Sequence, residues 1–133
     1  MNLVFVDTVG MLAVWNRADQ WHDDARRAYS LLSPSNTTLF STTLVLAECA
    51  NALARTSFRA EVDEFRKRLQ ADGTLIWPTP GDWEAAWTAY RQSGANQAGL
   101  VDQVSFLVMR RLGITQSFTN DRHFQVAGFV TLF

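Results

Sequence analysis

The stretch NLVFVD, residues 2–7, decides the fold class of this chain. It is short, almost wholly apolar and ends in an acid, a pattern typical of a strand buried on both faces of a parallel sheet. Helical patterns over 8–16 and 21–33 come next, and TTLFST at 37–42 predicts a second strand. A strand followed by helices and then by another strand indicates an α/β unit, because parallel strands need such a crossover.

The rest of the chain continues this alternation. The pattern predicts helices over 42–56, 59–73, 80–94 and 99–113, a third strand over 74–78 and a fourth over 116–119. Residues 120–124, NDRHF, are expected to form a turn, and 129–133 a short edge strand. We therefore predict an α/β fold with a mainly parallel central sheet of about four to five strands, flanked by helices.

Length and composition predict one globular domain over residues 1–133. Hydrophobic residues make up 47% and charged residues 19% of the chain, which excludes the disordered and fibrous classes. No stretch has the ~20 apolar residues of a membrane span, and the N-terminus lacks the basic start of a signal peptide. Cys49, the only cysteine, cannot form an internal disulfide. We therefore expect a cytoplasmic protein without a membrane partner.

Most of the 13 acidic residues have structural explanations. They begin helices, or they share the charged helix over 59–73 with basic residues, where i,i+4 pairing accounts for them. Four acids remain after this sorting, namely Asp7, Glu48, Asp102 and Asp121.

The positions of these four acids predict that they converge. Asp7 and Asp121 follow the first and fourth predicted strands. Asp102 lies near the start of the helix over 99–113. Glu48 lies in mid-helix among apolar and small residues, where a carboxylate is unfavourable unless it is paired or coordinates a cation. Since ligands bind at the carboxyl ends of parallel strands, we expect the four carboxylates to meet at that edge of the sheet.

A cluster of carboxylates indicates a hard cation, because like charges repel one another. Ligand atoms that are all oxygen, with no cluster of His or Cys, favour Mg²⁺ or Mn²⁺ over zinc. Without the cation, at least one carboxyl should have a raised pKa, since its neighbours oppose ionisation. Taken singly, three of the acids also have structural explanations: Asp7 and Asp102 as helix caps, and Asp121 as a turn former.

Four segments in this order resemble the PIN domain, specifically the small ribonucleases that act as VapC-type toxins of toxin–antitoxin pairs. They are VFVDT (4–8), LVLAECANAL (44–53), LVDQVSFLVMRRLGI (100–114) and SFTNDRHFQVAGF (117–129). The resemblance extends over nearly the whole chain. It implies a single PIN-like domain that cleaves RNA endonucleolytically with a divalent cation and leaves a 5′-phosphate and a 3′-hydroxyl.

The resemblance also implies roles for individual residues. The catalytic acids and metal ligands would be Asp7, Glu48, Asp102 and Asp121. Thr8 and Thr119 match hydroxyl positions beside the first and last of these acids. Asn51 and Ser105, one helical turn after Glu48 and Asp102, would orient carboxylates or water, or would be ordinary polar residues of the helix surface. For the reaction itself, we expect Glu48, or a metal-bound water near Asp102, to help remove the proton of the attacking water.

An RNA substrate would need local basic residues, because the net charge of the chain is −1. Nearly all the basic residues are arginines, which suit bidentate contacts to phosphate. Arg122 and Arg55 are the nearest in sequence to the proposed site, whereas Arg110 and Arg111 belong to the far end of their helix. His123 is interpreted as a structural, hydrogen-bonding residue, with a role as an acid or phosphate contact as the alternative.

The implied protein partners are a cognate antitoxin and a second copy of the chain in a homodimer. The aromatic stripe Trp83, Trp87 and Tyr90 is expected in the core; if part of it is exposed, it marks a dimer or antitoxin surface. The alternative to an enzyme is a non-catalytic module of the same fold that binds RNA or a protein. That alternative would be favoured if the acids were missing, and all four are present.

Overall fold

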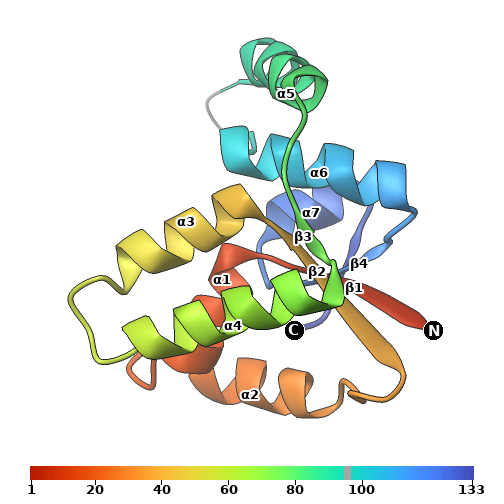
Figure 1. Cartoon of the computed structure of the whole chain (residues 1–133). Coiled ribbons are helices and arrows are strands. Elements are labelled where there is room, and N and C mark those ends of the chain that lie inside the picture. The colour runs from red at the N-terminus through yellow and green to blue at the C-terminus, as the bar shows by residue number, and fades with distance from the viewer. Residues whose placement is uncertain (95–96) are drawn as a thin grey trace.

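The computed structural model describes residues 1–94 and 97–133 as a central sheet with helices around it (Figure 1). In chain order its elements are β1 (Asn2–Val6), α1 (Thr8–Trp15), α2 (His22–Ser30), β2 (Thr37–Thr42), α3 (Thr43–Ala52), α4 (Arg59–Asp72), β3 (Leu75–Ile76), α5 (Pro80–Gln92), α6 (Leu100–Leu112), β4 (Gln116–Phe118), α7 (Arg122–Val126) and β5 (Val130–Thr131).

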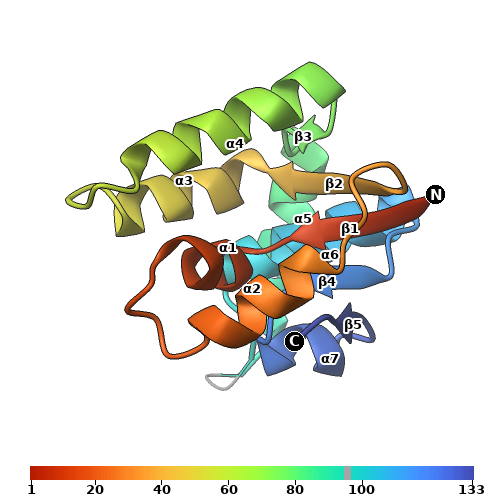
Figure 2. The same ribbon diagram turned by 90° about the horizontal axis from the view of Figure 1, so that it is seen from below.

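The sheet has five strands in the order β3-β2-β1-β4-β5, and every neighbouring pair is parallel. The predicted α/β class and the predicted parallel sheet are therefore confirmed. Figure 2 shows α1 and α2 on one side of the sheet and α5 and α6 on the other. Covered on both faces, β1 is the central strand, and Val4, Phe5 and Val6 have no exposed surface. This explains why its sequence is a continuous apolar run rather than an alternating one.

Local signals fix several helix ends. Thr79 and Asp82 form a capping box at the start of α5, where Pro80 occupies the first turn. Helices α4 and α6 end at Gly73 and Gly113, whose φ angles of 70° and 69° lie in the left-handed region that glycine adopts without strain.

One prediction of local structure is wrong. Residues 120–124 were expected to form a turn, but Arg122–Val126 form the short helix α7. Asp121 is its N-cap and accepts a hydrogen bond from the backbone N–H of His123 at 2.9 Å. The turn-forming residues therefore begin a helix instead of connecting directly to β5.

The register of the sheet brings the ends of three strands together. Phe5 of β1 pairs with Phe40 of β2, and Val6 of β1 pairs with Phe118 of β4. Helix α1 then passes so close to β4 that a Cβ atom on Gly10 would lie 2.1 Å from the carbonyl oxygen of Phe118. This close approach places the residue after β1 beside the residues after β4.

None of the helices in the described part of the chain is long and apolar enough to cross a membrane.

Candidate metal centre

The four acids singled out from the sequence line one cleft of about 500 Å³ at the carboxyl edge of the sheet. Asp7 comes from the end of β1, Glu48 from α3, Asp102 from the first turn of α6 and Asp121 from the start of α7. Thr8 and Asn51 also line this cleft. The expected convergence of the acids is confirmed; the roles assigned to them remain a prediction.

Asp7 is the most buried of the four acids, with 2% of its surface exposed. It occupies the N-cap position of α1, but its side chain makes no capping hydrogen bond to that helix. Its Oδ2 atom instead accepts a hydrogen bond from the hydroxyl of Thr119 at 3.0 Å. Burial, reinforced by the charge of Asp102, raises the pKa of Asp7 to about 7. The capping explanation therefore does not account for this carboxyl group.

Thr119 joins two of the acids. Its hydroxyl donates to Asp7 and accepts a hydrogen bond at 3.0 Å from the backbone N–H of Asp121. Thr119 is completely buried, so no solvent competes for either bond. The hydroxyl thereby fixes the Asp7 carboxylate relative to the chain that carries Asp121.

Asp102 faces this pair of acids from α6. Gly99 is the N-cap of α6, so Asp102 lies within the first turn and is not the cap. Its burial, followed by the negative charges of Asp121 and Glu48, raises the pKa of Asp102 to about 6. The predicted rise in the pKa of at least one carboxyl is found for Asp7 and Asp102, but burial, and not the charge of the neighbouring acids, is its largest cause.

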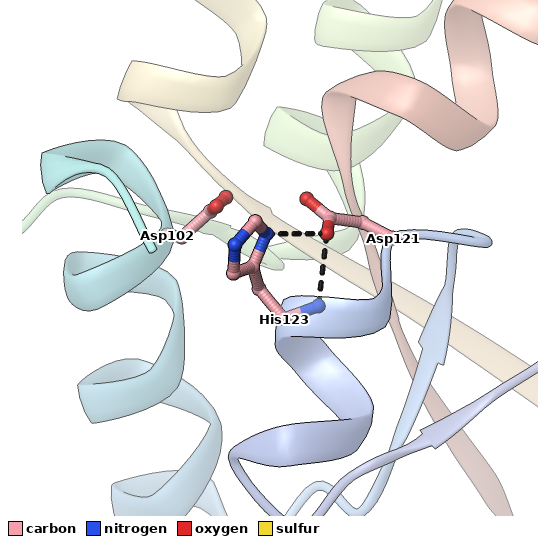
Figure 3. A group of neighbouring side chains, drawn as sticks. All are labelled: Asp102, Asp121 and His123. Atoms are coloured by element: carbon pink, nitrogen blue, oxygen red, sulfur yellow. Dashed lines mark hydrogen bonds and ion pairs between the residues drawn. The ribbon is translucent and has the colours of Figure 1, made fainter. Parts of the chain in front are cut away.

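His123 brings a ring nitrogen close to Asp102 and Asp121 and is a candidate metal ligand that the sequence did not predict. Its Nδ1 atom lies 2.7 Å from Oδ1 of Asp121, and Figure 3 shows its ring between Asp102 and Asp121. Ligand atoms of these three residues lie within 4.8 Å of one another. The structural hydrogen bond expected of His123 is present, and the ring also lies close enough to Asp102 and Asp121 for the three residues to share a cation. The spacing of Asp121 and His123 at a helix start is the signal that could have identified it.

Glu48 differs from the expectation in its environment. Its place among apolar residues suggested a carboxylate that is unfavourable without a partner, yet the side chain is exposed. The helix presents its apolar residues to the core and turns Glu48 toward solvent at the cleft. Its Oε1 atom accepts a hydrogen bond from the hydroxyl of Thr8 at 2.6 Å. Glu48 thus lines the cleft, and the expectation that its carboxylate is surrounded by apolar residues is wrong.

Asn51 and Ser105, the two other polar residues assigned to the site, lie in different environments. Asn51 is exposed and lines the cleft. Ser105 is buried, and its hydroxyl donates to the carbonyl of Val101 within α6 at 3.0 Å.

Cys49, interpreted as a core thiol, is completely buried, and burial followed by the charges of Asp7 and Glu48 raises its pKa to about 12. This keeps the thiol protonated, so it does not serve as a nucleophile.

The far end of α6 is structural, as expected for its arginines. Arg111 forms an ion pair with Asp82 of α5. The guanidinium of Arg110 lies 5.9 Å and 5.4 Å from the ring centroids of Phe106 and Phe129. Arg122 and Arg55 are exposed, and neither forms an ion pair with any other described residue.

The aromatic stripe of α5 is not the core feature that was expected. Trp83 is 41% and Tyr90 46% exposed, while Trp87 contacts both rings edge-on, at 6.0 Å and 5.2 Å between centroids. Helix α5 packs mainly on α6, and Trp83 and Tyr90 of the aromatic stripe remain exposed.

The donor set suits a hard divalent cation. Carboxylate oxygens are the ligands that Mg²⁺ and Mn²⁺ prefer, and one imidazole is compatible with Mn²⁺. The raised pKa values of Asp7 and Asp102 reflect the cost of ionising both carboxyls in this cleft, a cost that a bound cation would offset.

Known proteins resemble this chain over nearly its whole length. The family model described as PIN domain matches residues 4–130. The chain is 31% identical over 129 residues to the 23S rRNA-specific endonuclease VapC20 of Mycobacterium tuberculosis, and the match covers 96% of each protein.

Solved structures also resemble this chain. The crystal structure of Mycobacterium tuberculosis VapC20, described as a sarcin–ricin-loop-cleaving toxin, aligns with a TM-score of 0.79 and 26% identity over 96% of each chain. FitAcB of Neisseria gonorrhoeae (TM-score 0.65, 11% identity, 98% of this chain and 96% of the other) shares the fold. So does VapBC2 of Rickettsia felis, solved with a promoter DNA fragment (TM-score 0.62, 14% identity, 97% and 96%).

Proposed function

Because this chain belongs to the PIN-domain family and is a homologue of VapC-type toxins, we propose that it is the metal-dependent endoribonuclease toxin of a toxin–antitoxin pair. The observation that carries the proposal is the convergence of four acids on one cleft around a buried Asp7 whose pKa is about 7. A carboxyl in that state is of little use to the fold alone, but it is suited to exchanging its proton for a cation.

Asp7, Glu48, Asp102 and Asp121 would hold the cation, Mg²⁺ or Mn²⁺, and His123 would complete the set from α7. When bound, such an ion lowers the pKa of water and stabilises the negative charge that develops on phosphate oxygens. Phosphodiester hydrolysis needs both effects at a cleft of this kind.

The residues of the chain supply the positioning. Thr119 holds the buried Asp7 carboxylate in one orientation, and Thr8 does the same for Glu48. Glu48 is exposed at the rim of the cleft, so it is placed to accept a proton from the attacking water and release it to solvent. We assign Asn51, at the same rim, to orienting substrate or water, and Ser105 to supporting the first turns of α6 behind Asp102.

The test is cleavage of defined RNA by the purified protein. We expect 23S rRNA, the substrate class of the relative VapC20, to be cut in Mg²⁺ or Mn²⁺ and left intact in EDTA. Asp7→Asn and Asp102→Asn should abolish cleavage while remaining folded, and Asp72→Asn, an exposed acid at the end of α4, is the matched control. Binding of RNA without cleavage by the wild type would support a non-catalytic module instead. Undiminished cleavage in EDTA would remove the metal from the mechanism.

The partners proposed are a cognate antitoxin and a second copy of the chain. The exposed Trp83 and Tyr90 on α5 are the surface we assign to the homodimer, since aromatic rings are enriched in interfaces. Light scattering should give a dimer for the wild type and a monomer for Trp83→Arg. A monomeric wild type at working concentrations would contradict this assignment. We propose the cytoplasm as the compartment, consistent with a single buried thiol.

A further inference from the structure

We propose that a pocket on α2, beside the acidic cleft, binds a nucleobase next to the cleaved phosphate; the inference rests on the proposed RNA-cleaving function. The pocket has a volume of about 550 Å³ and lies between one face of α2 and the C-terminal segment. Figures 1 and 2 both place the C-terminus beside α2. We call it the α2 pocket, and its lining includes Trp21, Ala28, Leu31, Asn120, Leu132 and Phe133.

The α2 pocket adjoins the cleft through consecutive residues. Asn120 lines the pocket and Asp121 lines the cleft. Their Cα atoms are separated by about 3.8 Å, the length of one peptide unit. Arg122 follows, exposed and without an ion pair to any other described residue. One short stretch thus carries a residue of the pocket wall, an acid of the cleft and an exposed cation in succession, so a strand whose phosphate lies in the cleft has a base within reach of the α2 pocket.

Trp21 gives the pocket a flat aromatic wall that is already in position. Trp21 is 44% exposed, so it is accessible to a ligand. The backbone at Trp21 is fixed, because its N–H donates to Oδ1 of Asp19 at 2.8 Å and its carbonyl accepts from the N–H of Ala25 at 2.9 Å. An indole has only two rotatable side-chain bonds, so it loses little entropy on binding a base, and each base offers a flat surface for stacking.

The charges of the α2 pocket favour a base over a phosphate. Arg27 lines it but forms an ion pair with Asp24 on the same face of the helix, so the pair carries no net charge. The other walls are apolar, apart from Asn120. The Asn120 carboxamide has no hydrogen-bond partner among the described residues, leaving both a donor and an acceptor for the edge of a base. An uncharged, flat ligand with hydrogen-bonding edges fits this lining.

The test measures binding of short RNA in EDTA, where the strand stays intact. Labelled single-stranded pentamers of adenosine or uridine, and an abasic pentamer of the same length, are titrated at fixed salt by fluorescence anisotropy. We expect the wild type to bind the base-bearing pentamers about tenfold more tightly than the abasic one, a difference of about 1.4 kcal/mol within the range of base–aromatic stacking. Trp21→Ala should remove this difference, and Trp21→Phe should retain most of it.

Trp77→Ala is the matched control, because Trp77 is 73% exposed but does not line the α2 pocket. Asn120→Leu should change the preference between adenosine and uridine, which keeps the proposal testable if Trp21→Ala does not fold. In the cleavage assay Trp21→Ala should raise KM with little change in kcat.

Unchanged affinity of Trp21→Ala for base-bearing RNA would overturn the pocket assignment while leaving the nuclease intact. If Trp21→Ala changes the oligomeric state but not the affinity for RNA, the α2 pocket is a protein contact, and the proposal is overturned as well. Failure of the wild type to cleave any RNA overturns the proposed function itself, a result distinct from both.

Discussion

The metal-free protein should become more stable when Asp7 is replaced by Asn, and the gain should depend on pH. Asp7 is 2% exposed and its pKa is raised from 3.8 to about 7, chiefly by burial. At about 1.4 kcal/mol per pKa unit, that difference corresponds to about 4 kcal/mol of the free energy of unfolding. The value is an upper bound, because Asp102 and its other neighbours readjust their own ionisation when Asp7 changes.

The sign follows from proton binding. Below pH 3.8 both the native and the unfolded state hold the proton, and the raised pKa has no effect. Between 3.8 and about 7 the unfolded state loses its proton while the native state keeps it, so the free energy of unfolding falls as pH rises. Above a pH of about 7 the carboxyl is ionised in both states, and the full loss of stability is present. Asn carries no charge at any of these pH values, and its oxygen still accepts the hydrogen bond from Thr119.

The assay is urea unfolding of wild type and Asp7→Asn in EDTA, at about pH 4.5 and about pH 8. We compare the free energy of unfolding of Asp7→Asn with that of the wild type at each pH. The difference in favour of the variant should be larger at the higher pH by about 2–4 kcal/mol. Mn²⁺ should stabilise the wild type at the higher pH by mass action and should stabilise the variant much less.

Asp63→Asn is the control for the general effect of removing an acid. Asp63 lies on α4, exposed, and the hydrogen bonds and charge of Arg66 hold its pKa below the ordinary value. Its replacement can only remove a favourable interaction, so the variant should show no gain at high pH. An equal stability difference between Asp7→Asn and wild type at both pH values would refute the reasoning about the buried carboxyl.

Three further predictions follow from individual contacts. Thr119→Val removes the hydrogen bonds to Asp7 and from Asp121, so cleavage should fall about 10- to 100-fold while Thr119→Ser keeps it; equal rates for the two variants would show that the hydroxyl has no such role. Gly10→Ala places a Cβ atom 2.1 Å from the carbonyl oxygen of Phe118. Thermal melts should show a loss of at least about 3 kcal/mol, and a neutral effect would mean that α1 does not pack on β4 as described. Asp82→Ala removes the capping box of α5 and the ion pair with Arg111, and should cost about 1–3 kcal/mol in urea unfolding, against little change for the exposed Glu84→Ala.

Much of the fold could be read from local sequence. The apolar run over 2–7 and the alternation of strands and helices fixed the class, because burial on both faces of a sheet leaves a direct mark on the residues of each strand. Two of the acids in the cleft could also be recognised from their positions after strands. Asp7 and Asp121 follow strands, and the carboxyl ends of parallel strands must lie at one edge.

Side-chain environments could not be read in this way. The sequence placed Glu48 among apolar neighbours, but only the packing of α3 determines that its side chain faces solvent at the cleft. The same holds for Trp83 and Tyr90, whose exposure depends on how little of α5 the rest of the molecule covers. His123 entered the site because residues 122–126 form a helix rather than a turn.

The hydrogen bonds that hold Asp7 and Glu48 in the cleft join residues far apart along the chain. Thr119 and Asp7 are 112 positions apart, and Thr8 and Glu48 are 40 apart. No local pattern encodes such distances, because they depend on the sheet register and on the close approach of α1 to β4 that the missing side chain of Gly10 permits. The sequence by itself determined which acids are available for a metal; the tertiary structure decided which of them is buried, which is exposed, and which partners hold them in place.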